Sequence, residues 1–309
     1  MTAQVVSTAA QGSDEWLEGR RAGIGGSDVG AVLGLSPWAT PLSVWLSKQP
    51  GYDGGPPSEP MQWGHRLEPL VRDHYASQRP GVFVEEVPGI LAHPTRPWMR
   101  ASLDGLAHSR EGTRLLEVKT SRHGFDTVPD AYMAQVQWML AICSLEAADV
   151  ACLFSGNRYV EFEVESDLVL QREMADYCGD WWHRYVVSGT VPPADPVRDA
   201  PILSRVWTPD PGGSVEVDAD LAVRLREAKA RAAEADAEYK RLAAEVQSVM
   251  AEASTATVGD VRVASWTATK PRRFVDTARL KADGIYDSYT REGEATRTFR
   301  LDSKWLKDA

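Results

Sequence analysis

The 309-residue chain has few of the residues and patterns that mark secreted, membrane or zinc-binding proteins. Its three cysteines are too few and too scattered for a disulfide framework or a CxxC metal site. No apolar run approaches the ~18 residues that cross a bilayer, and the first residues lack the basic segment of a secretory signal. The histidines show no HxxxH spacing, and no P-loop is present. We therefore expect a cytoplasmic protein with no membrane partner.

Charge is distributed unevenly along the chain. The net charge is −10; residues 1–200 hold 26 acidic and 16 basic residues, whereas residues 201–309 hold 18 of each. An acidic first part argues against a surface that coats many phosphates. It is compatible with a nucleic-acid enzyme, because clustered carboxylates bind hard divalent cations and a narrow basic groove can coexist with an acidic outer surface.

A change of composition suggests the domain boundaries. Six prolines lie between residues 191 and 213, where they disfavour helix and central strand. We therefore predict a core over 1–190, a linker or surface strap over 191–215, and a C-terminal extension over 216–309.

The first 190 residues are predicted to mix helices and strands. The α/β fold class follows, with a mixed central sheet flanked by helices. The predicted helices cover 41–46, 61–78, 130–143 and 167–187, and the predicted strands cover 82–92, 97–107, 113–120, 148–154 and 159–165.

The extension begins with apolar positions that alternate in steps of four and three from Leu221 to Val249. This period predicts a long helix with a coiled-coil seam, which either packs within the chain or pairs with a second copy. A β-hairpin is predicted around 257–263. The basic residues Lys270, Arg272 and Arg273 follow it and are candidates for DNA contact.

Two short motifs carry the chemistry. Asp104 precedes Gly105, and Glu117 and Lys119 lie on one face of the next predicted strand. An antiparallel hairpin that turns between residues 110 and 111 places Asp104 opposite Glu117, with Cβ atoms roughly 4.5–5.5 Å apart. Carboxylates that close repel each other unless a cation lies between them, which suggests a bridging Mg²⁺. Taken alone, however, Glu-x-Lys is more often a solvated ion pair, and Asp-Gly is often only a turn.

The motif Asp-Gly, a spacer and Glu-x-Lys resembles the metal site of the PD-(D/E)xK nuclease superfamily. Three other blocks resemble the YqaJ viral recombinase and phage lambda exonuclease branch, and all occur in that family's order over about residues 13–187. These blocks are Trp16-Leu17-Glu18-Gly19-Arg20-Arg21-Ala22-Gly23-Ile24-Gly25-Gly26-Ser27-Asp28, Trp63-Gly64-His65-Arg66-Leu67-Glu68 and Ala131-Tyr132-Met133-Ala134-Gln135-Val136-Gln137.

The resemblance implies a restriction-endonuclease-like core and a role for each matched residue. Asp104, Glu117 and the Val118 carbonyl resemble the ligands of Mg²⁺, or of Mn²⁺ as an alternative ion. Lys119 resembles the catalytic lysine, and Glu68 an acid that assists the site. The residues that resemble the 5′-phosphate site are Arg21, Ser27, Ser102 and Gln135.

The glycine-rich loop before Ser27 supports the phosphate assignment, because its backbone can approach an anion closely. Ser27 is predicted to cap the helix that runs to Leu33, whose free N–H groups would attract phosphate. Arg21 is chosen over Arg20 by its spacing to Ser27. Simpler interpretations remain: Ser27 only caps a helix, Glu68 only pairs with Arg72 four residues on, and the glutamines only flank the core.

The sequence thus predicts a metal-dependent 5′→3′ exonuclease that acts on double-stranded DNA ends and leaves a 3′ single strand. The resemblance also implies a ring-shaped homotrimer and a phage single-strand annealing protein as partner. The alternatives are an endonuclease or repair nuclease of the same superfamily, which would cut closed circular DNA, and a non-catalytic DNA-end adaptor.

Overall fold

The computed structural model describes residues 3–10, 12–52, 55, 58–207, 210–268, 270, 275–291, 299–302 and 305. The chain divides into two units, one ending at Val206 and one beginning at Trp207.

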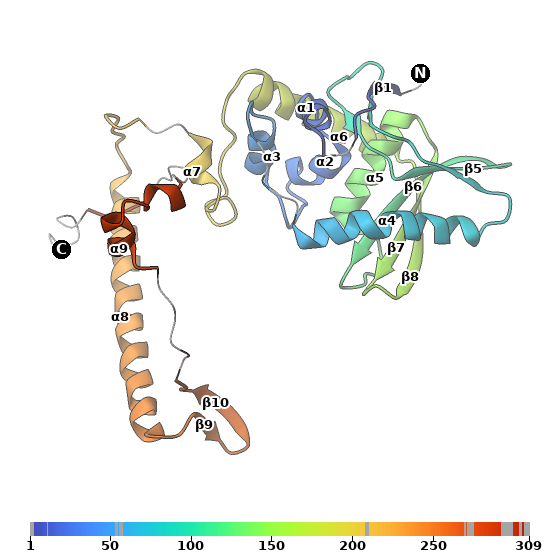
Figure 1. The fold of residues 1–309 in the computed structure, drawn as a ribbon. Helices are drawn as coiled ribbons and strands as arrows, with labels where there is room; N and C mark the ends of the chain where they lie inside the picture. Colours follow the sequence, from blue (N-terminus) through green and yellow to red (C-terminus); the bar gives the residue numbers. More distant parts are fainter. Residues whose placement is uncertain are drawn as a thin grey trace. The chain divides into compact units, whose positions relative to one another are not determined.

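A five-stranded mixed sheet lies at the centre of the first unit (Figure 1). Only β6 and β7 run parallel, and α5 (Asp130–Cys143) lies between them in the chain, as a parallel connection requires. The other neighbours are antiparallel. The strand order is β2 (Phe83–Glu85), β5 (Gly105–Ser109), β6 (Gly112–Ser121), β7 (Ala147–Phe154) and β8 (Arg158–Glu165).

Helices cover both faces of this sheet, so alternate residues of β6 enter two apolar clusters. Leu115 packs in the larger cluster with Trp138 of α5. Leu116 packs in the smaller cluster with Val71 and Tyr75 of α4 (Glu59–Ser77). This arrangement confirms the predicted α/β class with a mixed sheet between helices.

The first unit has further strands and helices outside this sheet. A second, three-stranded sheet has the order β1 (Gln4–Ser7), β3 (Ile90–Ala92) and β4 (Arg100–Ala101). The other helices are α1 (Asp14–Arg21), α2 (Gly26–Val32), α3 (Pro41–Ser47), α6 (Leu168–Trp181) with a π-helical turn at Trp182–Val187, and α7 (Leu203–Val206).

Two predicted strands are wrong in extent. The segment 82–92 forms β2 and β3 in different sheets, because Pro88 and Gly89 break it; Gly89 has a φ of +90° and lies against the Ser7 carbonyl, where a Cβ atom would clash. The arm 97–107 is also divided. Its first part, β4, pairs with β3, and the chain joins β6 only from Gly105 onward.

The second unit confirms the predicted long helix and hairpin. The helix α8 (Ala219–Met250) is followed by β9 (Thr255–Val258) and β10 (Val261–Ser265), then by α9 (Thr277–Ala282) and a 3₁₀ turn at Asp287–Tyr289. Most of the apolar seam of α8 is exposed, including Tyr239 and Val249. Arg272 and Arg273 lie outside the described residues. Among the described helices, none combines the length and apolar character needed to span a bilayer.

Candidate active site

The hairpin of β5 and β6 brings the two predicted acids to one place. Gly105 pairs with Leu116 and Ser109 with Gly112, which is the predicted register. Asp104 lies one residue before β5, so it stands opposite Glu117 at the point where the chain leaves the sheet. Its Oδ2 accepts a hydrogen bond from the Val118 amide at 2.8 Å, which fixes the carboxylate against β6.

Glu117 and Lys119 point from β6 toward α5. Glu117 is only 2% exposed, and its Oε1 accepts hydrogen bonds from Lys119 Nζ at 2.6 Å and Gln135 Nε2 at 2.8 Å. Lys119 Nζ also donates to Gln135 Oε1 at 2.9 Å and lies 4.7 Å from the centre of the Tyr132 ring. Glu117 Oε2, by contrast, is buried with no hydrogen-bond partner among the described residues. This oxygen is therefore an open acceptor inside the site.

Glu68 reaches the same region from α4. Its Oε1 lies 3.8 Å from the Arg72 guanidinium, and Arg72 in turn donates to the Asp104 carbonyl at 3.0 Å. The ion pair of Glu68 with Arg72, four residues further along α4, is therefore present. It also sets Glu68 close enough to Asp104 for their charges to repel.

Burial dominates the electrostatics of the acids. Burial, reinforced by the charge of Glu68, raises the pKa of Asp104 to about 6. Burial, reinforced by Asp104, raises the pKa of Glu117 to about 7. Burial alone would lower the pKa of Lys119, but the charge and hydrogen bond of Glu117 raise it. Lys119 is thus an ammonium group at neutral pH, which donates hydrogen bonds rather than acting as a base.

The donor set fits a hard divalent cation. The carboxylates of the half-buried Asp104 and the buried Glu117 lie close enough to repel, and the pKa of each is raised. Glu117 Oε2 has no hydrogen-bond partner among the described residues, so a cation would relieve both the repulsion and the unpaired oxygen. The described ranges contain no group of three or more His, Cys, Asp or Glu side chains arranged to hold an ion. The remaining ligands would therefore be the Val118 carbonyl, water and substrate oxygens.

These raised pKa values predict that the metal-free protein loses stability as the pH rises. Below the unfolded pKa of about 4 both carboxyls are protonated in either state, and the fold carries no penalty. Between that pH and about 6 for Asp104 or about 7 for Glu117, the unfolded chain is ionised while the fold keeps the carboxyl protonated, so stability falls, and above these pKa values the loss is complete. This costs on the order of 3 kcal/mol for one carboxyl.

The measurement is the melting temperature of the protein in EDTA between pH 5 and pH 8, with and without added Mg²⁺. We expect the temperature to fall across this window and the metal to restore it at pH 8. A flat or rising metal-free curve would contradict the raised pKa values. Asp28 does not contribute to this pH dependence. Lys48 and Arg20 lower its pKa to about 2, so its effect on stability lies below pH 5.

Arg20, at the end of α1, is the arginine that lies against the predicted phosphate loop. Arg20 donates to Ser27 Oγ at 2.8 Å and to Asp28 Oδ1 at 3.2 Å. Arg21 instead donates to Glu18 and to the Tyr52 carbonyl. The structure therefore brings Arg20, and not the predicted Arg21, to Ser27, because adjacent residues of a helix point in different directions and the Arg20 side of α1 faces the loop.

The prediction that Ser27 caps α2 is wrong. The N-cap is Gly25, whose amide donates to Asp28 Oδ2 at 3.0 Å. Asp28 also binds the buried Lys48 Nζ at 2.6 Å. Burial alone would raise the pKa of Asp28, but Lys48 and Arg20 together lower it. A protein carboxylate therefore occupies the helix end that was expected to attract an anion, and Arg20 and Ser27 remain as side-chain donors.

Gln135 connects the loop to the acids. A Cβ atom on Gly26 would lie 3.3 Å from Gln135 Cγ, so the loop rests directly on the side chain that binds Lys119 and Glu117. Gln137 faces elsewhere, bonding the Glu165 carbonyl, as its different helix face predicts. Ser102 is exposed two residues before Asp104.

Sequence reasoning missed two residues around the site. Tyr132 lies one helical turn before Gln135 and shares its face, a signal already present in the quoted block. No sequence pattern points to Lys48, because a lysine at the end of a short helix normally extends into solvent. In the structure Lys48 is only 7% exposed.

Comparison with known proteins agrees with this description. Residues 15–146 match the model of the YqaJ-like viral recombinase domain, a range that includes Arg20, Asp104, Glu117, Lys119 and Gln135. Residues 15–146 are thus similar to a YqaJ-like viral recombinase domain.

The chain is also similar to a curated protein and to solved structures. The uncharacterized protein YqaJ of Bacillus subtilis is 28% identical over 314 residues, and the alignment covers 94% of each protein. The alkaline exonuclease LHK-Exo of Laribacter hongkongensis is 22% identical with a TM-score of 0.47, over 57% of this chain and 94% of that one. A phage-related exonuclease from Haemophilus somnus is 13% identical with a TM-score of 0.41, over 54% of this chain and 96% of that one.

Proposed function

We propose that this chain is a metal-dependent deoxyribonuclease that degrades double-stranded DNA from 5′ ends and leaves a 3′ single strand. The observation that carries the proposal is the pair of the half-buried Asp104 and the buried Glu117, with an unpartnered carboxylate oxygen of Glu117 beside the Lys119 ammonium. A carboxylate pair next to a lysine suits phosphodiester hydrolysis, because it provides a cation site and a fixed positive group for the reacting phosphate.

Each residue has a distinct task in this proposal. Asp104, Glu117 and the Val118 carbonyl would hold Mg²⁺ or Mn²⁺. When bound, the ion polarises the scissile phosphate and lowers the pKa of water. Lys119 donates to the attacking water or the phosphate and offsets developing negative charge. Glu68 repels Asp104 and thereby strengthens the demand for a cation.

The substrate end would be held by the neighbouring loop. Arg20 is about one-third exposed and Ser27 is exposed, so both can reach an anion. Gln135, beneath Gly26, would place that anion next to Lys119, and the exposed Ser102 would complete the contacts. An end-binding group this close to the acids favours cleavage that begins at a DNA terminus.

Substituting the two neighbouring arginines tests the end-binding loop. We expect Arg20→Ala to reduce the preference for 5′-phosphorylated over unphosphorylated duplex about tenfold or more, the usual worth of a charge-assisted hydrogen bond. Arg21→Ala is the matched control and should retain the preference, because its guanidinium is occupied by Glu18 and the Tyr52 carbonyl. The measurement is the initial cleavage rate on the two substrates; an effect of Arg21→Ala alone would return the assignment to that residue.

A nuclease assay on defined DNA tests the proposed function. Linear duplex labelled at either 5′ or 3′ ends should lose its 5′ nucleotides in Mg²⁺ or Mn²⁺, and EDTA should stop the reaction. Covalently closed circles should remain intact. Cleavage of the circles would instead favour an endonuclease, and binding of ends without cleavage in either metal would favour an adaptor.

The proposal extends to the assembly and partner that the resemblance implies. A homotrimer would encircle the remaining strand, and a phage single-strand annealing protein would receive it. The molar mass in solution and co-purification with such an annealing protein test these two parts separately from the chemistry.

A further inference from the structure

An exposed aromatic side chain lies beside the candidate active site. Trp38 is 73% exposed, although burial of an indole ring is normally favourable. Its ring is stacked on Tyr132, with centroids 5.8 Å apart and an interplanar angle of 18°. Tyr132 in turn lies 4.7 Å from Lys119 Nζ. The two rings thus form a stack that begins at the lysine and ends in solvent.

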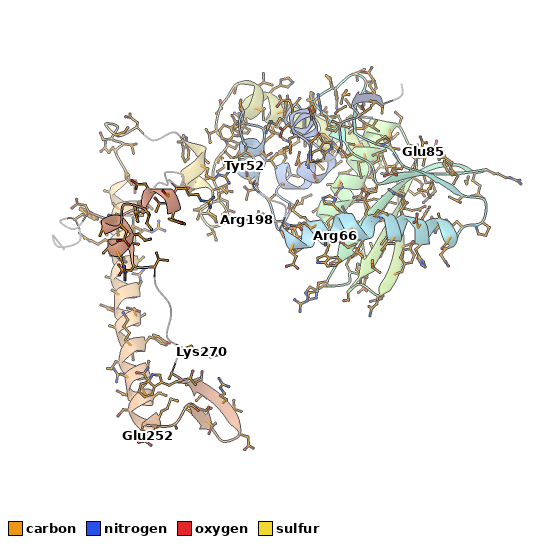
Figure 2. The ribbon with its side chains drawn as sticks, in the orientation of Figure 1. Tyr52, Arg66, Glu85, Arg198, Glu252 and Lys270 are labelled. Atoms are coloured by element: carbon orange, nitrogen blue, oxygen red, sulfur yellow. The ribbon has the colours of Figure 1, made fainter. Side chains whose placement is uncertain are left out.

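The loop that carries Trp38 is fixed by several hydrogen bonds. Ser36 Oγ accepts from the Trp38 and Ala39 amides, each at 3.2 Å. Arg198 donates to the Ser36 carbonyl at 2.6 Å and to the Ala39 carbonyl at 2.8 Å. Arg198 belongs to the segment that follows the π-helical turn, where Figure 2 labels it. The ring is therefore presented on a fixed backbone rather than on a free loop.

Close packing of two helices brings this loop to the lysine. A Cβ atom on Gly30 of α2 would lie 3.2 Å from the Ala131 carbonyl of α5, so the helices approach closely where Tyr132 begins the stack. Thr40, at the other end of the loop, is buried and donates to the buried Asp199. Both ends of the segment that holds Trp38 are thus anchored.

From this geometry we infer that Trp38 and Tyr132 form a stacking platform for a nucleobase next to the reacting phosphodiester. This inference rests on the proposed function. A flat ring with a solvent-facing side binds any base by stacking, so the platform would be tolerant of sequence. Its ligand would be a base that has left the duplex stack at the end being degraded, which the platform would hold while Lys119 contacts the backbone.

The experiment uses full-length protein and duplex DNA with 2-aminopurine, a fluorescent base, at the first or second 5′ position. Binding is followed in Ca²⁺ and cleavage in Mg²⁺. We expect wild-type protein to quench the fluorescence. Trp38→Ala should lose the quenching and raise the KM about tenfold, the effect of one lost base stack, with kcat within about threefold. Trp38→Phe should restore most of both.

Phe83→Ala is the matched control, because Phe83 is 67% exposed and stacked on His108 at 6.2 Å and 19°, on the edge strand β2. It should quench and cleave as wild type does. If Trp38→Ala behaves like Phe83→Ala, the platform is refuted even though the nuclease stands. If wild-type protein cleaves no DNA but quenches in a Trp38-dependent way, the proposed chemistry fails and the base-binding platform stands.

Discussion

Lys119→Ala is expected to reduce DNA cleavage about a thousandfold while leaving end binding intact. The Lys119 ammonium lies 2.6 Å from Glu117, and both side chains are largely shielded from water, with 16% and 2% of their surfaces exposed. Glu117 raises its pKa, so the positive charge is present at neutral pH. Charge that develops on the phosphate would lose its fixed counter-charge in the variant. The groups assigned to the end, Arg20 and Ser27, are unchanged.

Single-turnover kinetics measure the loss of cleavage. Binding of a labelled duplex in Ca²⁺ measures whether end binding is retained. Lys240→Ala is the matched control, because Lys240 forms a similar 2.7 Å pair with Asp236 on the exposed face of α8. It should cleave normally. Cleavage by Lys119→Ala within tenfold of wild type would remove Lys119 from the mechanism, and loss of end binding would make it a binding residue.

Asp104→Asn is expected to abolish cleavage and yet stabilise the metal-free protein at pH 8. The amide oxygen can still accept from the Val118 amide, so the local structure is kept. The substitution removes a half-buried carboxyl group whose pKa is raised to about 6, a gain of up to about 3 kcal/mol. Loss of one of two carboxylate ligands should also remove the increase in melting temperature caused by Mg²⁺. A residue kept at a cost to stability is typical of a functional site.

Melting curves in EDTA and in Mg²⁺, with cleavage rates, check this prediction. Asp73→Asn, an exposed change on α4, is the control and should alter none of them. If Asp104→Asn were less stable than wild type in EDTA at pH 8, the carboxylate would be a structural group, and the case for a cation at this position would be lost.

The two acids could be located from the sequence because local geometry determines them. A short antiparallel hairpin has its register fixed by its turn, so pairing about residues 110 and 111 was enough to set Asp104 opposite Glu117. Gln135 was found through the family pattern, and its contacts with Lys119 and Glu117 follow from the packing of α5 on β6.

Other features depend on contacts between distant segments, which no local pattern reports. Arg20 and Arg21 are neighbours on one short helix, and only the position of the 23–27 loop decides which reaches Ser27. The N-cap of α2 is Gly25 and not Ser27, because the Asp28 side chain accepts a hydrogen bond from the Gly25 amide. Trp38 gave no signal, since a single aromatic residue in a loop has no periodicity, and its stack with Tyr132 depends on how α2 meets α5.

The link between Arg198 and Ser36 has a consequence for biosynthesis. The two residues are 162 positions apart, so a growing polypeptide has made the acids and the lysine well before it makes the arginine that secures the tryptophan loop. Domains generally fold as units as they leave the ribosome. The nascent protein would therefore anchor the segment that holds Trp38 only after residue 199 emerges, later than it makes Asp104, Glu117 and Lys119.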